Sequence, residues 1–299
     1  MTPRNNLQAW WWAARPKTLT GAFIPVILAG AQAWADGVFR LHLWLCCLAF
    51  AGLMQIAANF INDLYDFLKG SDRADRLGPE RACAQGWITP GAMKRGIAVV
   101  IIAACAIGLL AVILAGQIFP TMGAEFIAVG VLCVAFAFLY TTRLSYLGWG
   151  DVLVLVFFGL IPVCGTYYIM SERLSADVLL LSLISGLAID ALLVINNYRD
   201  RDQDKLSGKR TLVVRFGARA GSIHYLIIGL LADVLMPLVV PSPWVLLPMG
   251  IYTALHVSTW RRMNTIGQGR ALNAILGETS RNMFLMALLL SSVILSANA

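Results

Sequence analysis

The sequence predicts an all-α, polytopic membrane protein with nine transmembrane helices, and three observations lead to that prediction. Of the 299 residues, 59% are hydrophobic and 13% are charged, whereas roughly a quarter of the residues in an average soluble domain are charged. Apolar runs of about 20 residues, enough to cross a bilayer, recur along the whole chain. The connections between these runs alternate between basic and nearly uncharged. We therefore expect a single transmembrane domain over residues 1–299, surrounded by membrane lipid.

The nine apolar runs are taken in order as the membrane spans. Trp10, Trp11 and Trp12 precede the first run and are typical of a membrane interface. Because Arg15 and Pro16 interrupt the apolar residues there, we expect no cleavable signal peptide. The expected spans cover about residues 19–36, 41–67, 94–115, 122–141, 147–170, 175–199, 219–240, 243–260 and 274–297.

The basic residues indicate the side of the membrane that each connection faces. In this arrangement 21 of the 23 Lys and Arg residues lie in the N-terminal segment and after the even-numbered spans, and the exceptions are Arg40 and Arg173. Because cytoplasmic loops carry an excess of Lys and Arg, we predict a cytoplasmic N-terminus and an external C-terminus in a bacterial inner membrane. The net charge of +7 is explained by topology and anionic lipid, and we expect no nucleic acid among the partners.

Acidic and amide residues gather at two stations on the predicted cytoplasmic side. The first station, Asn62 to Asp72, follows a stripe at helical spacing formed by Gln55, Asn59, Asn62 and Asp66. The second station, Asn196 to Asp204, belongs to a stripe formed by Asp190, Asn197, Asp200 and Asp204. Polar groups are costly inside a bilayer, so such stripes face a bundle interior or a wet cavity.

The two stations also share a pattern. Asn62-x-x-x-Asp66 matches Asn196-x-x-x-Asp200 four spans later. This match predicts two four-helix repeats, about residues 19–141 and 147–260, followed by a ninth helix.

The stations predict a magnesium and diphosphate site. Carboxylates on successive helical turns supply the oxygen ligands that Mg²⁺ prefers, together with water and phosphate oxygens. The expected ligands are Asn62, Asp66, Asp72, Asn196, Asp200 and Asp204. Basic residues lie between the acids and would bind the remaining phosphate oxygens. The alternative is pairing of acids with bases in solvated loops, which we expect for Asp75, Glu80 and Asp202.

Cysteine and histidine predict no further metal centre. The six cysteines include no C-x-x-C pair, and most lie within apolar runs as small core residues. The three histidines, His42, His224 and His256, are scattered without an H-x-x-x-H motif. A zinc or haem site is therefore not expected.

Four blocks of the sequence resemble the UbiA superfamily of intramembrane aromatic prenyltransferases. They are ARPKTL (14–19), NDLYDFLKGSDRADRLGP (62–79), LGWGDVLVLVFFG (147–159) and NNYRDRDQDKLSGKRTLVVRFG (196–217). Within the superfamily the chain is most similar to the branch that prenylates 1,4-dihydroxy-2-naphthoate in menaquinone synthesis. The resemblance runs nearly end to end, and it implies nine helices around a central cavity capped by cytoplasmic loops.

The resemblance also implies an activity and a set of site residues. The activity is Mg²⁺-dependent transfer of a polyprenyl group from polyprenyl diphosphate to 1,4-dihydroxy-2-naphthoate, with loss of diphosphate and CO₂. The family motif N-D-x-x-D-x-x-x-D covers the first station but places its last Asp at Gly70 rather than Asp72. The expected catalytic residues are Asp63, Asp66, Tyr140, Asp200 and Asp204. Those expected to bind diphosphate are Arg15, Lys17, Lys69, Arg76, Arg143 and Lys209.

The chemistry needs an apolar interior as well as charge. Loss of diphosphate leaves an allylic cation, and aromatic ring faces favour cations. We expect rings to line the interior, among them Tyr140, Phe157, Phe158, Tyr167 and Tyr168. The residues expected to orient the aromatic acceptor are Asp151, Asp190 and Asn197.

Two alternatives stay open. One is a prenyltransferase of the same superfamily with another acceptor, such as 4-hydroxybenzoate or homogentisate. The other is a secondary transporter, in which polar residues and repeats also meet inside the membrane. A transporter usually places its charges near the middle of the membrane, whereas here most lie at the predicted cytoplasmic ends.

Overall fold

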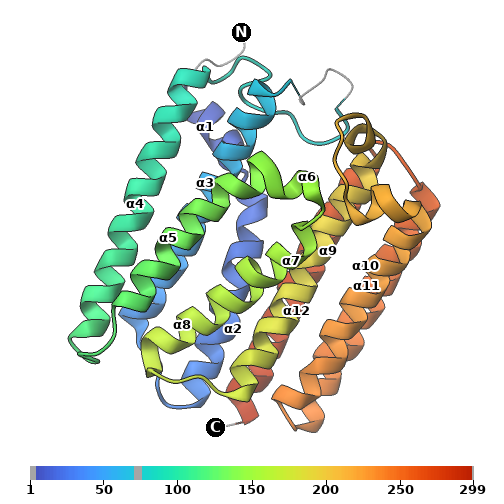
Figure 1. The fold of residues 1–299 in the computed structure, drawn as a ribbon. Coiled ribbons are helices and arrows are strands. Elements are labelled where there is room, and N and C mark those ends of the chain that lie inside the picture. Colours follow the sequence, from blue (N-terminus) through green and yellow to red (C-terminus); the bar gives the residue numbers. More distant parts are fainter. Residues whose placement is uncertain (1–4, 71–75, 298–299) are drawn as a thin grey trace.

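The computed structural model describes residues 5–70 and 76–297, and its regular structure in those ranges is entirely helical (Figure 1). The helices are α1 (Leu7–Ala14), α2 (Leu19–Ala35), α3 (Leu41–Leu68), α4 (Pro90–Gly116), α5 (Ala124–Leu139), α6 (Ser145–Leu147), α7 (Gly150–Val154), α8 (Ile161–Ser171), α9 (Ala176–Leu206), α10 (Leu212–Val239), α11 (Leu246–Ile266) and α12 (Leu272–Ala297). π-Helical segments follow α5 (Tyr140–Leu144) and α7 (Leu155–Leu160). The predicted all-α class is confirmed.

Eight stretches of the described chain are long and apolar enough to cross a membrane. They contain α1 with α2, α3, α4, α5 with α6, α7 with α8, α9, α10 and α12. Helix α11 forms where the eighth span was expected, but it is not one of these eight, and it carries the polar residues His256, Arg261 and Arg262. The predicted count of nine spans is therefore not confirmed.

Two helices carry the acidic stations at their C-terminal ends. Helix α9 continues past the expected end at residue 199 to Leu206, so Asp200 and Asp204 lie on its last turns. Helix α3 ends at Leu68, and Gly70 then adopts a φ of 65°. Glycine enters this left-handed region without steric cost and commonly terminates a helix there.

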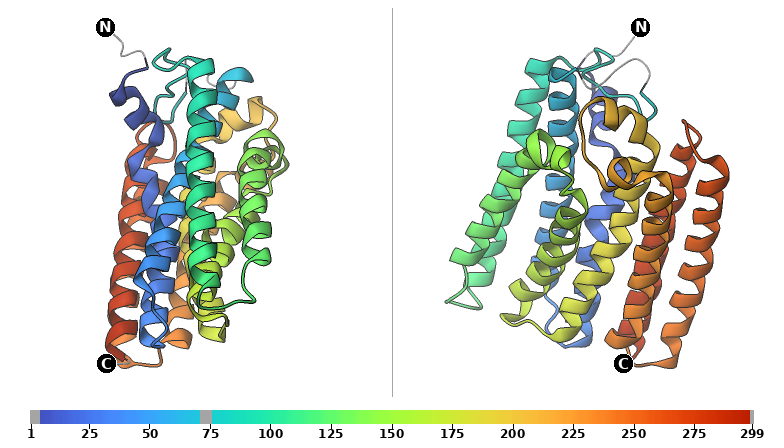
Figure 2. Two further views of the ribbon diagram at one scale, coloured as in Figure 1. Left: turned by 90° about the vertical axis from the view of Figure 1, so that its left-hand side faces the viewer. Right: turned by 45° about the vertical axis from the view of Figure 1, so that its right-hand side comes forward.

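The long helices stand side by side, and several polar connections gather at one end of the bundle (Figures 1 and 2). This polar end contains residues 76–89, which lead to α4, the loop after α9 and the loop after α11, whereas α12 finishes at the opposite end. Helix α9 packs against α2, α7, α8, α10 and α12. Because the C-terminal ends of α3 and α9 both point to the polar end, the two stations are brought to the same end of the bundle.

Candidate functional site

A cavity of about 730 Å³ lies among the helices below the polar end. Its wall is mainly apolar and comes from α2, α3, α4, α5, α9 and the stretch from α7 to α8. The rings of Phe136, Phe157 and Phe158 belong to it, as does Tyr140. Its polar wall residues include Arg15, Thr18, Gln55, Asn59, Asn62 and Asn196. The predicted inward direction of the polar stripe on α3 is confirmed for Gln55, Asn59 and Asn62.

The aromatic lining differs from the prediction at two residues. Tyr167 and Tyr168 are not among the described wall residues. The hydroxyl of Tyr167 instead donates a hydrogen bond to Asp36 at 2.5 Å, and Tyr168 packs against Phe126. Both follow the wall residue Gly165 on α8, and helical rotation turns them away from the cavity.

Arg15 reaches the cavity wall because the chain breaks between α1 and α2. Arg15 has a φ of 50° at the C-terminal cap of α1, a conformation uncommon for residues other than glycine. Asn59 holds this break by donating hydrogen bonds to the Ala14 carbonyl and the Thr18 hydroxyl, both at 2.9 Å. Nη2 of Arg15 is buried and has no hydrogen-bond partner within the described residues. A buried, unsatisfied guanidinium donor in a cavity wall is suited to an anionic ligand.

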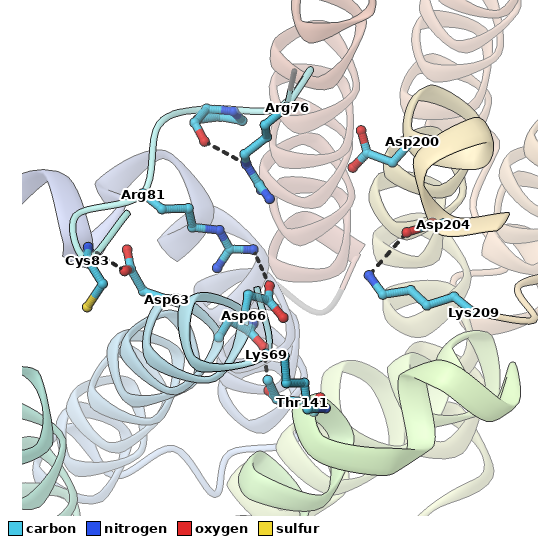
Figure 3. Close-up of polar contacts among 12 residues, drawn as sticks. Asp63, Asp66, Lys69, Arg76, Arg81, Cys83, Thr141, Asp200, Asp204 and Lys209 are labelled. Carbon is cyan, nitrogen blue, oxygen red and sulfur yellow. Dashed lines mark hydrogen bonds and ion pairs between the residues drawn. The ribbon is translucent and has the colours of Figure 1, made fainter. Parts of the chain in front are cut away.

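In the first station, Asp66 forms an ion pair with Arg81 (Figure 3). The carboxylate and guanidinium are 2.7 Å apart, and their side chains are 14% and 8% exposed. One turn earlier, Asn62 accepts a hydrogen bond from the hydroxyl of Thr141 in the π-helical segment after α5. Asn62 and Asp66 therefore follow one face of α3 from the cavity wall to the polar end.

Asp63 has a different environment from Asp66. It is 1% exposed, and its two oxygens accept hydrogen bonds from the backbone amides of Ala82 and Cys83, both at 2.8 Å. Figure 3 shows this carboxylate turned toward the segment that leads to α4 and away from the second station. Asp63 thus fixes the segment that carries Arg81, the partner of Asp66.

In the second station, Asp200 and Asp204 are each paired with a basic residue close in sequence. Arg199 holds Asp200 with two hydrogen bonds of 2.7 and 2.6 Å. A further donor of Arg199 reaches Asn273 on α12, and Asn273 in turn donates to the Leu77 carbonyl. This chain of contacts connects the second station to the segment that follows the first.

Asp204 pairs with Lys209, which lies just after α9. Its Oδ1 is 3.1 Å from Nζ of Lys209 (Figure 3). Burial lowers the pKa of Lys209, but the carboxylates of Asp204 and Asp66 outweigh that effect, so the pKa is raised. Lys209 therefore stays charged at neutral pH and interacts with acids of both stations.

The two stations meet at Tyr146 of α6. Nζ of Lys69 lies 4.3 Å from the centroid of the Tyr146 ring, and Nζ of Lys209 lies 5.6 Å from it. Lys69 also donates hydrogen bonds to the carbonyls of Thr141 and Thr142. The Tyr146 ring thus receives Lys69 of the first station and Lys209, the partner of Asp204 in the second, which brings the two stations together beyond the end of α5.

The remaining residues predicted for the site differ in exposure and in their contacts. Lys17 and Arg143 are exposed, and Asp72 and Asp75 lie outside the described residues. Arg76 donates to the Pro79 carbonyl at 3.1 Å. On α9, Asn196 lines the cavity, whereas Asn197 is half-buried and is not among the described wall residues.

Asp151 and Asp190 form a separate cluster with His224. They come from α7, α9 and α10, and none is among the described wall residues of the cavity. Asp190 is 2% exposed and faces His224 on α10, so the predicted stripe on α9 points into the bundle interior here and not into the cavity.

Sequence reasoning missed the contacts that cross between helices. The links of Thr141 to Asn62, Tyr146 to the two lysines and Asn273 to Arg199 join segments far apart in the chain. The signal for Arg81 and Arg199 was their place among the acids. His224 had a weaker signal, namely an ionisable residue inside an expected span, which is by default a functional hypothesis.

The chemistry of the donor set at the stations fits Mg²⁺. Asn62 and Asn196 offer amide oxygens, and Asp66, Asp200 and Asp204 offer carboxylates, so all are the hard oxygen ligands that Mg²⁺ prefers. Each of the three carboxylates is paired with one cationic side chain. These same cations can bind phosphate oxygens when the carboxylates take a metal ion.

Known proteins similar to this chain are prenyltransferases. Residues 22–291 match the UbiA prenyltransferase family. The 1,4-dihydroxy-2-naphthoate octaprenyltransferase of Escherichia coli (strain K12) is 40% identical over 216 residues, which cover 71% of this chain and 70% of that protein. The enzyme of the same name from Mycobacterium tuberculosis (strain H37Rv) is 32% identical over 293 residues, covering 93% and 94%.

Solved structures share the fold. A UbiA homologue from Archaeoglobus fulgidus bound to DMAPP and Mg²⁺ has a TM-score of 0.65 at 12% identity, covering 95% of this chain and 98% of that one. An apo UbiA homologue from Aeropyrum pernix K1 has a TM-score of 0.68 at 16% identity, covering 92% and 97%. The resemblance inferred from four sequence blocks is confirmed, and the chain is an integral membrane protein that belongs to the UbiA prenyltransferase family.

Proposed function

We propose that this protein transfers a polyprenyl group from polyprenyl diphosphate to 1,4-dihydroxy-2-naphthoate. Diphosphate and CO₂ leave, and the product is demethylmenaquinol, a precursor of menaquinone. The single observation that carries the proposal is a largely apolar cavity of about 730 Å³ whose wall includes Arg15 and the first residue of each acidic station, Asn62 and Asn196. The names of the relatives at 40% and 32% identity support the naphthoate as acceptor.

The polar end binds the diphosphate in this proposal. Arg15 offers a buried donor, while Arg81, Arg199 and Lys209 shift from their carboxylate partners to phosphate oxygens. Asn62, Asp66, Asn196, Asp200 and Asp204 would hold Mg²⁺. A bound Mg²⁺ ion neutralises charge on the leaving diphosphate.

In this proposal the cavity wall binds the isoprenoid chain and stabilises the cation formed from it. Apolar side chains exclude water, so water does not add to the allylic cation to give an alcohol. The rings of Tyr140, Phe136 and Phe157 present faces or edges to the same space, and ring faces attract cations. The naphthoate ring then supplies the electron pair that forms the new carbon–carbon bond, and loss of its carboxyl group as CO₂ restores the aromatic ring.

Some assignments remain proposals that rest on the sequence. We keep Asn197 as a residue that orients the acceptor, because it neighbours the wall residue Asn196. We also keep a cytoplasmic N-terminus and polar end and an external C-terminus, supported by the distribution of Lys and Arg. A bacterial inner membrane is supported by the bacterial relatives. The two four-helix repeats are supported by the matching places of the stations at the ends of α3 and α9.

An assay of the purified protein in lipid tests the function. The protein would receive a polyprenyl diphosphate with dihydroxynaphthoate, 4-hydroxybenzoate or homogentisate, with Mg²⁺ or with EDTA. We expect prenylated product and CO₂ with the naphthoate and Mg²⁺ only. If product formed with 4-hydroxybenzoate or homogentisate but not with the naphthoate, the acceptor proposed here would be wrong. Full activity in EDTA would contradict the metal-assisted mechanism.

A further inference from the structure

Asp151, Asp190 and His224 form a polar cluster that is not among the described wall residues of the cavity. Asp151 is the second residue of α7, Asp190 lies within α9, and His224 lies on α10. One ligand atom from each residue lies within 4.8 Å of the other two. Asp190 is only 2% exposed. Three helices therefore converge on a small space with two carboxylates and one imidazole.

One polar atom of each side chain in this cluster lacks a hydrogen bond within the described part of the chain. Oδ1 of Asp151, Oδ1 of Asp190 and Nδ1 of His224 are buried without a hydrogen-bond partner among the described residues. His224 approaches Asp151 at 3.8 Å and Asp190 at 4.0 Å, both too long for a direct hydrogen bond. Ionisable groups inside a membrane bundle are costly unless they are paired. An occupant that contacts all three side chains would remove that cost.

We propose that Asp151, Asp190 and His224 bind a divalent transition-metal ion, with Zn²⁺ as the best-suited ion. Two carboxylates balance the charge of a divalent cation, and an imidazole nitrogen favours transition metals over Mg²⁺. Zn²⁺ binds such ligands at about 2.0–2.2 Å, which places the ligand atoms about 3–4 Å apart. Atoms that already lie within 4.8 Å of one another need only small side-chain rotations to reach that spacing.

This site is distinct from the acidic stations in position and in chemistry. Asp190 precedes Asp200 by ten residues on α9, which corresponds to about 15 Å along a helix. The stations offer only oxygen ligands, whereas this cluster adds a nitrogen. A bound ion would tie α7 to α9 and α10 next to the π-helical segment Leu155–Leu160. We therefore assign the ion a structural role in holding the wall of the bundle.

Metal analysis of the purified, full-length protein tests the site. The protein is stripped with chelator, loaded with Zn²⁺ in excess Mg²⁺, desalted and measured by mass spectrometry, in parallel with Asp190→Asn, His224→Gln and His224→Cys. We expect about one Zn²⁺ per chain in the wild type and near zero in Asp190→Asn and His224→Gln. His224→Cys should retain zinc, because a thiolate is also a zinc ligand. Co²⁺ in place of Zn²⁺ should give visible absorption that disappears in His224→Gln.

Matched controls separate this site from the stations and from misfolding. Asp66→Asn and Asp200→Asn should keep the zinc, since they alter only the stations. Size-exclusion chromatography and helical circular dichroism identify any variant that fails to fold, and His224→Cys then decides the question. A wild type that binds no zinc, or variants that all retain it, would overturn the proposal. So would unchanged zinc with a raised KM for dihydroxynaphthoate in Asp190→Asn, which would make the cluster part of the acceptor site.

Discussion

The two acidic stations resemble each other in sequence but are held in place by different means. In the first station, the neighbouring acids have separate tasks, since Asp63 binds the Ala82 and Cys83 amides and Asp66 binds Arg81. In the second station, Asp200 and Asp204 both pair with cationic side chains. Asp66, Asp200 and Asp204 are thus paired with cations that a diphosphate can attract, whereas Asp63 accepts hydrogen bonds from backbone amides.

This comparison teaches that an Asp in a shared motif need not act on the substrate. A carboxylate whose two oxygens are buried on backbone amides has its strong acceptor sites occupied. We therefore interpret Asp63 as a positioning residue that fixes Arg81 and, through it, Asp66. The corresponding anchor in the second station is Arg199, which is 3% exposed and bonded to Asn273.

The largest expected effect comes from removing an acid that faces the diphosphate. Asp66→Ala and Asp200→Ala should each lower kcat by about a hundredfold to a thousandfold, as loss of one group that stabilises transition-state charge does. The measurement is product formation by the purified variants in lipid at saturating Mg²⁺. Because each substitution leaves a buried guanidinium without its carboxylate partner, thermal unfolding in detergent checks that the variants compared are folded. Activity that survives in Asp66→Ala but not in Asp200→Ala would show that only the second station acts on the diphosphate.

Substitution of Asp63 should mainly lower the stability of the protein. Asp63→Ala leaves two buried amides without acceptors, at a cost of about 1–3 kcal/mol for each group, whereas Asp63→Asn keeps one acceptor oxygen and should cost less. Thermal unfolding in detergent measures the difference between Asp63→Ala, Asp63→Asn and the wild type. If Asp63→Ala melted like the wild type and yet lost all activity, Asp63 would belong with the substrate-facing acids.

Arg15 should separate substrate binding from the chemical step. Loss of a hydrogen bond to a charged group costs about 1.5–3 kcal/mol, so Arg15→Ala should raise the KM for polyprenyl diphosphate roughly tenfold to a hundredfold. The KM for the naphthoate should change little. Arg173→Ala is the control, because Arg173 is exposed in the loop between α8 and α9. A selective rise in the acceptor KM instead would place Arg15 on the naphthoate.

The smallest expected effect concerns the pH dependence of Lys209. Its pKa is raised above the usual 10.5, so Lys209 stays protonated at neutral pH, and on the alkaline side its ion pair with Asp204 is lost only as pH rises through the higher, folded-state pKa. Between neutral pH and pH 9 the stability contribution of this pair should therefore stay constant. Thermal unfolding of wild type and Lys209→Gln over that range checks this, and a difference between them that shrinks with pH would contradict it.

Much of the fold could be predicted from hydropathy alone. The lengths of the apolar runs located the long helices, and the C-terminal ends predicted for the spans that contain α3, α8 and α12 agree with the structure to within two residues. The prediction was less successful for α9, whose last turns are polar and extend beyond the apolar run. It was also less successful for α11, whose polar residues lower its mean hydropathy. Helix formation depends on backbone hydrogen bonds and not on apolarity, so a helix extends beyond the lipid when its residues permit it.

The sequence by itself determined the membrane class, the acid and amide pattern of both stations and the family resemblance. These are local properties, since span length, helical spacing and motif order can be read along one segment at a time. Only the tertiary structure decided that Asp63 faces backbone amides, that Lys69 and Lys209 meet at Tyr146, and that His224 joins Asp151 and Asp190. Each of these depends on how helices far apart in the chain pack and rotate, and that packing is set by contacts that no single segment contains.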